Sequence, residues 1–237
     1  MSFEAGQSLI AVPAPGTRPV LVRRFVPATD ARLVSLITAL LHRAYGKQVG
    51  LGLKPLAGRQ DDSMTLKRCS SGECFIIFDV AGTGGASSIG QVQVQGQGQG
   101  KHNGESNGHP VAANFEHEGV AAGKLVGVII LNEIESDEGP DWFARSGVAS
   151  FSQLAVDTSA QGRGIGRLLL ETVEARAAER GATELALSMA EPDDDLRRFY
   201  QRHGYRIVAT WKWPYTNYVS LILSKSLKPA MPPLPMA

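Results

Sequence analysis

The chain has 237 residues, of which 43% are hydrophobic and 20% are charged, a composition typical of a globular protein with a sizeable core. Its 24 Lys and Arg residues nearly balance its 23 Asp and Glu residues, so no overall field favours nucleic acid or an anionic membrane. No apolar run approaches the roughly 18 residues of a membrane-spanning helix, and the N-terminus lacks a secretory signal, so we expect a cytoplasmic protein without membrane or nucleic-acid partners.

The N-terminal part predicts a strand followed by a helix. Residues 1–19 contain prolines and glycines without periodicity, and we expect them to form a flexible lead-in. Val20 to Val26 alternate weakly between apolar and polar side chains, which predicts a strand. The helix that follows is expected to be capped by Thr29 or Asp30 and to end at Gly46. Its apolar face consists of Leu33, Leu36, Ile37, Leu40 and Leu41.

The next segment predicts a short helix and two strands. The helix is expected around "DDSMTLKRC" (Asp61 to Cys69), and the strands are expected at Cys74 to Val80 and Lys124 to Leu131. Cys69 and Cys74 have no further Cys or nearby His with which to complete a tetrahedral set. We therefore expect two free thiols and no bound metal.

Residues 81–123, between these strands, are rich in Gly, Gln, Ser and Asn and include "QVQVQGQGQGK" (Gln91 to Lys101). Such a composition buries too little apolar area to offset the entropy of ordering, which is roughly 1–2 kcal/mol per residue. We expect an insertion in a strand-to-strand connection. It is expected to be mostly disordered, although the QVQV alternation could form a short strand.

From Val148 onward the pattern predicts alternating strands and helices. The helix that opens at Gly164 is expected to end at Gly181, and Asp193 to Asp195 suit the cap of a shorter helix. Residues 228–237 are expected to form a C-terminal tail. The apolar stripe of the first helix is expected to be Leu168, Leu169, Val173 and Ala177. The expected strands are Val148 to Val156, Thr183 to Met189, Tyr205 to Trp213 and Tyr218 to Leu227. This order predicts the α/β class with a mixed sheet.

Two glycine-rich stretches compete as a phosphate cradle, "QGRGIGRLLLE" (Gln161 to Glu171) and the stretch that begins at Gln91. A cradle needs backbone N–H groups that converge at the N-terminus of a helix. Only the stretch at Gln161 follows a strand and opens an amphipathic helix, and Arg163 and Arg167 can add positive charge there. We therefore interpret it as an anion-binding loop, and the stretch at Gln91 as a spacer.

The known nucleotide motifs fit this loop poorly. A Walker loop needs Gly-Lys-Ser/Thr, whereas Gly166 is followed by Arg167 and Leu168. A dinucleotide fingerprint needs a G-x-G-x-x-G spacing and an acidic partner about 20 residues on, which would be Glu184 inside an alternating strand. The ligand is therefore expected to be another phosphate compound.

At these residues the chain resembles the GNAT family of acetyl-CoA-dependent N-acyltransferases. Gln161, Gly164 and Gly166 match the family signature Q/R-x-x-G-x-G/A, and "LRRFYQRHGYR" (Leu196 to Arg206) follows in the family's order and spacing. The resemblance extends over Val20 to Leu227 apart from the insertion. It implies one GNAT acetyltransferase domain, with a mixed, mostly antiparallel sheet flanked by helices. Its fourth and fifth strands would splay to admit the pantetheine arm of the acyl donor, acetyl-CoA.

The resemblance also implies the site residues. Backbone groups of Leu154 and Val156 would pair with pantetheine, and the N–H of Val156 would face the thioester oxygen. Tyr200 would lie near the sulfur and act as the catalytic acid, because a phenol stays protonated at neutral pH. The implied coenzyme-binding residues are Leu154, Ala155, Val156, Gln161, Gly162, Arg163, Gly164, Ile165, Gly166 and Arg167.

The general base is left open. Some relatives carry a Glu early on the fourth strand, where this chain has Ser150 to Gln153, none of which is a base. Either water relays the proton, or an acid arrives from the loop with Glu133, Glu135, Asp137, Glu138 and Asp141, which is otherwise a solvated turn. His203 is expected at the surface.

The expected walls of the acceptor site are the aromatic hairpin tip and the first helix with the stretch to Leu66. In the hairpin, Trp211, Trp213 or Tyr215 could line the site or pack across strands.

The leading hypothesis is an N-acetyltransferase that uses acetyl-CoA and acts on a small-molecule or peptide amine by direct transfer in a ternary complex. The alternatives are a non-catalytic acyl-CoA-binding or sensing module on the same fold, and a scaffold protein whose insertion carries the function. The acceptor, the acyl chain length and the oligomeric state, with a homodimer among the options, stay open.

Overall fold

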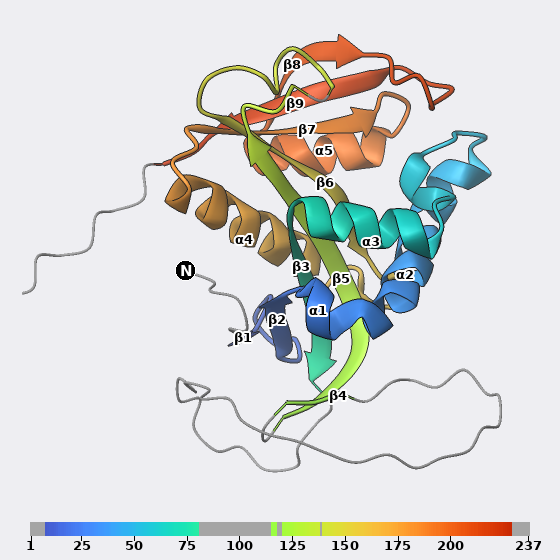
Figure 1. Cartoon of the computed structure of the whole chain (residues 1–237), viewed down its shortest axis with the longest axis vertical. Helices are drawn as coiled ribbons and strands as arrows, with labels where there is room; N and C mark the ends of the chain where they lie inside the picture. The colour runs from blue at the N-terminus through green and yellow to red at the C-terminus, as the bar shows by residue number, and fades with distance from the viewer. Residues whose placement is uncertain (1–7, 81–114, 118–119, 138, 229–237) are drawn as a thin grey trace, which may run out of the picture.

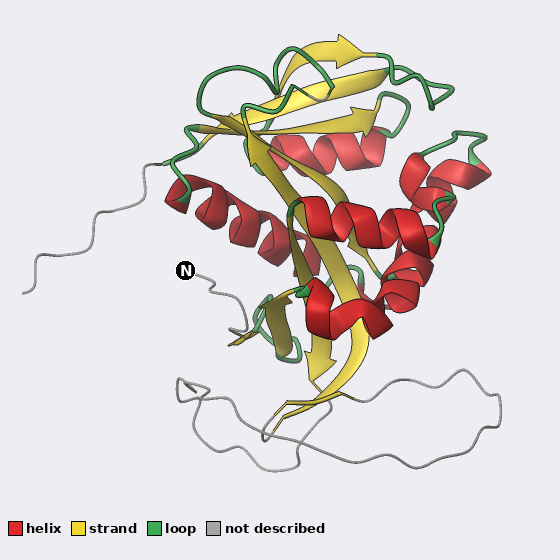
Figure 2. Cartoon of the chain, in the orientation of Figure 1, coloured by secondary structure: helices red, strands yellow, loops and turns green. Residues whose placement is uncertain are grey.

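The computed structural model describes residues 8–80, 115–117, 120–137 and 139–228 (Figure 1). These residues form one mixed sheet of nine strands, with helices on both faces (Figure 2). The strands are β1 (Ser8–Ala11), β2 (Val20–Arg24), β3 (Glu73–Val80), β4 (Phe115–His117), β5 (Val120–Ile134), β6 (Val148–Val156), β7 (Glu184–Ala190), β8 (Arg206–Trp211) and β9 (Ser220–Ser226). The α-helices are α1 (Pro27–Asp30), α2 (Val34–Gly50), α3 (Asp62–Ser71), α4 (Ile165–Glu179) and α5 (Asp194–Arg202).

The order of the strands in the sheet is β1-β2-β3-β5-β6-β7-β9-β8, and β4 pairs with β5. All neighbours are antiparallel except β6 and β7, which are parallel because α4 provides the crossover between them. The pairing of β6 with β7 covers only Val148–Phe151 against Glu184–Leu187. Beyond that point the two strands part, so the predicted fold class, with its splayed fourth and fifth main strands, is confirmed.

Two hydrophobic cores lie on opposite faces of the sheet. The core under α4 and α5 includes Phe151, Leu187 and Tyr200, and the core under α2 includes Ile37, Leu41 and Ile76. The buried positions of α4 are Ile165, Leu169, Leu170, Thr172, Val173 and Ala177. The predicted stripe was therefore wrong at Leu168, which is only half-buried because it lies at the edge of this face.

The predicted cap of the first helix was also wrong. The helix with the predicted apolar face is α2, and its cap position is occupied by Leu33 without a side-chain hydrogen bond, whereas Asp30 lies at the end of α1. The carboxylate of Asp30 accepts hydrogen bonds from the guanidinium of Arg23 at 2.6 and 2.8 Å and from the backbone N–H of Val26 at 2.8 Å. A bidentate ion pair with a neighbouring strand therefore replaces the local cap.

Helix α2 continues past Gly46, where the sequence predicted its end, to Gly50. Its last turn contacts the start of α5. The amide of Gln48 donates to Asp193 at 2.8 Å, and Lys47 forms an ion pair with Asp195. These tertiary contacts offset the small cost of a glycine inside the helix.

The last part of the Gly- and Gln-rich segment contains β4 and the start of β5. Residues 81–114, including "QVQV", lie outside the described residues.

Both cysteines are free and buried. Within the described ranges, no cluster of His, Cys, Asp and Glu could hold a metal ion. No helix in these ranges is long and apolar enough to cross a membrane.

Asp157, directly after β6, holds this strand to two neighbouring elements. Its carboxylate is 1% exposed and accepts hydrogen bonds from Lys124 at 2.8 Å, Arg43 at 2.8 Å and the Ser159 hydroxyl at 2.6 Å. Burial raises the pKa of this carboxyl, but the hydrogen bonds from Lys124, Ser159 and Arg43 lower it by more than burial raises it. The net result is a pKa below the usual range.

Replacing Asp157 by Asn is expected to lower the free energy of unfolding at pH 7 by about 2 kcal/mol, because two cations lose a buried partner. The folded-state pKa lies below the unfolded value near 4, so the carboxylate stabilises the fold above about pH 4 and loses this effect as the pH falls. Urea denaturation measures the free energy of unfolding of both proteins. We expect the difference between wild type and Asp157→Asn to be smaller below pH 4 than at pH 7. Asp141→Asn, at an exposed carboxylate, is the control. Equal stabilities of Asp157→Asn and wild type at pH 7 would contradict the assignment.

Candidate functional site

The gap between β6 and β7 exposes one backbone edge of β6. The N–H of Asp157 donates to the carbonyl of Val126 on β5, and Ala155 pairs with Val128. Because successive backbone N–H groups along a strand point to alternate sides, those of Leu154 and Val156 point away from β5, toward the gap. The backbone of Ala155 faces β5, and its side chain lies in the core under α2.

A backbone irregularity precedes this edge. Gln153 has a φ of 55°, one of two non-glycine residues with positive φ among those described. The pairing of β5 with β6 shifts register beside it, between Val128 and Ile130. Such a bulge bends a strand, and here it coincides with the place where β6 leaves β7.

The loop from Gln161 to Arg167 leads into α4 through two glycines with positive φ. Gly162 and Gly164 have φ values of 77° and 82°, and Gly164 is the left-handed N-cap of α4, with no side-chain cap. A Cβ at Gly164 would lie 2.6 Å from the carbonyl oxygen of Pro13. Gln161 is exposed, whereas Ile165 is buried in the core under α4.

Both arginines of this loop contact other parts of the chain. Arg163 forms a bidentate ion pair with Asp79 at 2.6 and 3.0 Å. Arg167 donates to the carbonyl oxygen of Pro13 at 2.9 Å. Residues 8–17 therefore pack where the sequence predicted a flexible lead-in: β1 pairs with β2, and Pro13 lies against the loop.

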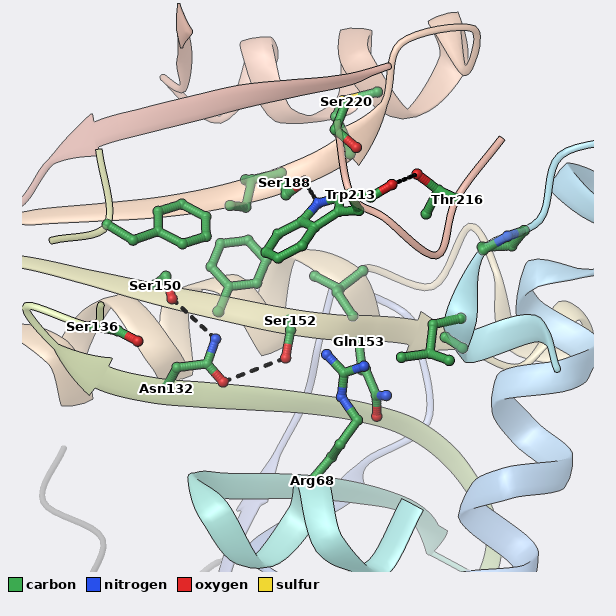
Figure 3. A pocket seen from close by; sticks show the side chains of 18 of the residues that line it. Arg68, Asn132, Ser136, Ser150, Ser152, Gln153, Ser188, Trp213, Thr216 and Ser220 are labelled. Atoms are coloured by element: carbon green, nitrogen blue, oxygen red, sulfur yellow. Dashed lines mark hydrogen bonds between the residues drawn. The ribbon is translucent and has the colours of Figure 1, made fainter. Parts of the chain in front are cut away.

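A cavity of about 870 Å³ opens where β6 and β7 part (Figure 3). Leu154 on β6 and Tyr200 on α5 line this cavity. Residues from the C-terminal half of α2 and from α3 also line it. Tyr45 on α2 and Met64 on α3 are among them, together with Leu56 from the segment between the two helices. The helical region and the hairpin, which the sequence analysis expected as two walls of one site, therefore line the same cavity.

Tyr200 is the buried phenol of the cavity. Its side chain is 4% exposed, and its ring packs against those of Phe199, Tyr205 and Phe151 at centroid distances of 5.4, 5.8 and 6.0 Å. Burial, and then the neighbouring Tyr45 and Asp193, raise the pKa of Tyr200 well above its usual value. Its hydroxyl is therefore protonated at neutral pH, and it has no hydrogen-bond partner among the described residues.

Polar groups from β5 and β6 line the opposite side of the cavity. The amide of Asn132 donates to the hydroxyl of Ser150 at 3.0 Å, and Ser152 lies beside it (Figure 3). Asp193 caps α5 by accepting from the N–H of Leu196 at 3.2 Å.

The acidic loop reaches the cavity only in part. Glu133, Glu135 and Asp137 line it, Asp141 does not, and Glu138 lies outside the described residues. Glu135 already accepts hydrogen bonds from Ser146 and from the N–H of Gly147. Two carboxylates thus remain available to a ligand.

The hairpin contributes aromatic side chains. Trp213 donates from Nε1 to the Ser188 hydroxyl at 2.9 Å and stacks on Tyr215 at 5.5 Å, and both line the cavity. Trp211 lies outside the cavity lining and packs against Ile222 and the ring of Trp213. His203 is half-buried outside the cavity lining, with its Nδ1 2.8 Å from the carbonyl oxygen of Phe199.

Two residues that the sequence analysis did not assign to the site also line the cavity. Arg68 reaches it from α3, and Gln153 reaches it from β6 (Figure 3). In the sequence, Gln153 is distinguished only as part of Ser150 to Gln153, a stretch without a base. No motif marks Arg68, and only the packing of α3 beside the sheet places it here.

The profile of the family described as the acetyltransferase (GNAT) family matches residues 79–205, more than half of the chain. Among solved structures, an acetyltransferase from Streptococcus agalactiae is similar, with a TM-score of 0.54 at 14% identity over 88% of this chain and 98% of that chain. The ribosomal-protein-S18-alanine N-acetyltransferase from Escherichia coli has a TM-score of 0.51 at 13% identity, over 92% of this chain and 99% of that chain. No curated protein matches the sequence. At these identities the structural matches show a shared fold.

Proposed function

The chain belongs to the GNAT acetyltransferase family, and we propose that it transfers an acetyl group from acetyl-CoA to a primary amine. The observation that carries this proposal is that the open edge of β6, at Leu154, and the protonated phenol of Tyr200 meet at one cavity. An acyl acceptor and a thioester can meet there directly, in a ternary complex.

The coenzyme side of the site fits acetyl-CoA in its donor groups. The N–H groups of Leu154 and Val156 are free of β5 and β7 and are available to the pantetheine amides. The uncapped N-terminus of α4, with Gly162 and Gly164 in the left-handed region, offers N–H groups to the pyrophosphate. Arg163 and Arg167 support the loop through Asp79 and Pro13.

In the transfer, the nitrogen of the neutral amine attacks the thioester carbon, so that a C–N bond forms and the C–S bond breaks. In this scheme the N–H of Val156 stabilises the negative charge on the thioester oxygen. Tyr200 gives its proton to the departing thiolate. The proton of the amine leaves through water or through Glu133 or Asp137, which line the cavity.

We propose a small-molecule or peptide amine as the acceptor and the cytoplasm as the location. The alternative is a non-catalytic module that binds acyl-CoA. It is favoured by the absence of a carboxylate at Ser150–Gln153, the stretch of β6 that borders the cavity.

Isothermal calorimetry with acetyl-CoA, followed by free-thiol release across a panel of amines, tests this function. We expect binding with one site per chain, and thiol release that depends on the amine. Binding without turnover on any amine would favour the binding module. Absence of binding would refute both readings.

A further inference from the structure

Arg68 is a half-buried cation in the cavity without a counterion among the described residues. It lies in the last turn of α3, and its guanidinium forms no ion pair and no hydrogen bond with any described residue. Other half-buried arginines in the described ranges are paired, as Arg163 is with Asp79 and Arg176 with Glu73. Figure 3 shows the Arg68 side chain extending from α3 toward β6, into the cavity.

The other charged side chains of the cavity lining leave this cation unneutralised. They are Lys67, Glu133, Glu135 and Asp137. Lys67, Glu133 and Asp137 are exposed, and Glu135 is held by Ser146 and Gly147. The lining therefore offers carboxylates on the β5 side and a guanidinium on the α3 side, which suits a ligand that carries both signs of charge.

The side-chain oxygen of Gln153, in the same cavity, also lacks a partner within the described ranges. Gln153 is 5% exposed, and its Oε1 is buried without a hydrogen bond among the described residues. Its Nε2 donates to Oε1 of Gln60 at 2.6 Å, and Nε2 of Gln60 donates to the Thr65 hydroxyl at 2.8 Å. The Thr65 hydroxyl in turn donates to the carbonyl oxygen of Asp61 at 3.0 Å.

This chain of donors determines which way the Gln153 amide points. With the Thr65 hydroxyl donating to Asp61 and accepting from Thr38, Gln60 donates to Thr65 and Gln153 donates to Gln60. In this arrangement the Oε1 of Gln153 is left as an acceptor. A buried acceptor that lacks a donor costs free energy, which a ligand N–H would recover.

We propose that the acceptor is a small amine that also carries a carboxylate, as a free amino acid does. The guanidinium of Arg68 binds the carboxylate, and Oε1 of Gln153 accepts a hydrogen bond from the amine. The planar fork of an arginine matches a carboxylate with two parallel hydrogen bonds, and a volume of about 870 Å³ suits a ligand of this size. This inference rests on the proposed acetyl transfer and names the substrate class of the same site.

The test uses sets of three amines that share a side chain: an amino acid, its neutral amide and its decarboxylated amine. Phenylalanine, phenylalaninamide and phenethylamine form one set. Initial rates of thiol release give kcat/KM, which is expressed per unprotonated amine because the three amino groups differ in basicity. We expect the wild type to favour the amino acid over both analogues by about tenfold or more. A preference for either neutral analogue would overturn the proposal.

Arg68→Gln is expected to remove this preference by lowering kcat/KM for the amino acid far more than for its amide, and Arg68→Lys should restore part of it. Lys67→Gln is the matched control, because it removes the same charge from the neighbouring, exposed position and should keep the preference. If Arg68→Gln lowers kcat/KM equally for all three amines, Arg68 has only a structural role in helix α3. If Lys67→Gln lowers kcat/KM for the amino acid in the same selective way, the preference comes from the overall positive charge near the cavity and not from a contact with Arg68. Either result overturns the proposal.

Gln153→Leu separates the second contact from the first. It is expected to raise KM for the amino acid and the amide alike, about tenfold, while the preference for the carboxylate persists. Circular dichroism melting checks that the lost bond to Gln60 has not unfolded the site. An unchanged KM for both amines in folded protein would remove Gln153 from the acceptor site.

Calorimetry keeps the inference independent of turnover. With acetyl-CoA replaced by coenzyme A, the amino acid should bind wild type more tightly than its amide does, and Arg68→Gln should abolish the difference. If this difference is present but no amine is acetylated, the proposed transfer fails while the carboxylate site stands. If amines are acetylated without any such difference, the transfer stands and the carboxylate site fails.

Discussion

Replacing Tyr200 by Phe is expected to lower kcat about 100-fold, while the affinity for acetyl-CoA stays within about twofold of wild type. The substitution removes only a hydroxyl that has no partner among the described residues, so the aromatic packing with Phe151 and Phe199 persists. What is lost is the proton for the departing thiolate. Thiol-release kinetics measure kcat, and calorimetry measures the affinity.

Tyr205→Phe is the matched control. Tyr205 belongs to the same ring cluster, 5.8 Å from Tyr200, and is similarly buried, but it lies outside the cavity lining and its hydroxyl donates to Glu174. We expect this variant to lose some stability and to keep kcat. Equal kcat in Tyr200→Phe and wild type would remove Tyr200 from the mechanism, and equal losses in both variants would reduce its role to packing.

Replacing Gly164 by Val is expected to weaken acetyl-CoA binding by 100-fold or more. The residue has a φ of 82°, which a β-branched residue adopts only with strain, about 1–2 kcal/mol. A Cβ there would lie 2.6 Å from the carbonyl oxygen of Pro13, so the backbone must shift. Any shift moves the first N–H groups of α4, to which we assign the pyrophosphate.

Gly181→Val controls for strain alone. Gly181 follows α4 at its other end with a φ of 90°, and no atom lies within 4 Å of its expected Cβ. Both variants should lose stability in thermal melts, but only Gly164→Val should lose binding in calorimetry. Retained affinity in folded Gly164→Val would show that the loop does not hold the coenzyme.

Much of the fold was predictable because local pattern and tertiary packing agree. The strand at Val148–Val156 and the helices at α3, α4 and α5 form where periodicity and capping residues predicted them, and Asp193 caps α5 as expected. The prediction failed where a distant partner decides the outcome. Asp30 pairs with Arg23 rather than capping a helix, and Gln48 extends α2 by bonding to Asp193.

The candidate site divides in the same way. Gln161, Gly164 and Gly166 mark in the sequence the loop that we assign to the coenzyme, because such a loop depends on consecutive backbone groups and on a glycine with positive φ, which is Gly164 here. The acceptor side has no such local requirement. Arg68, Asn132, Gln153 and Trp213 come from four separate segments and meet only because β6 and β7 part.

The sequence by itself determined the family, the order of strands and helices, and the loop that we assign to the acyl donor, because each depends on residues that are close together in the chain. Only the tertiary structure decided which side chains line the cavity that we assign to the second substrate. A guanidinium without a counterion and an amide oxygen without a donor, both within the part of the chain that the structure describes, are properties of the whole packed environment. No stretch of sequence reveals a missing partner, because a partner can come from any part of the chain.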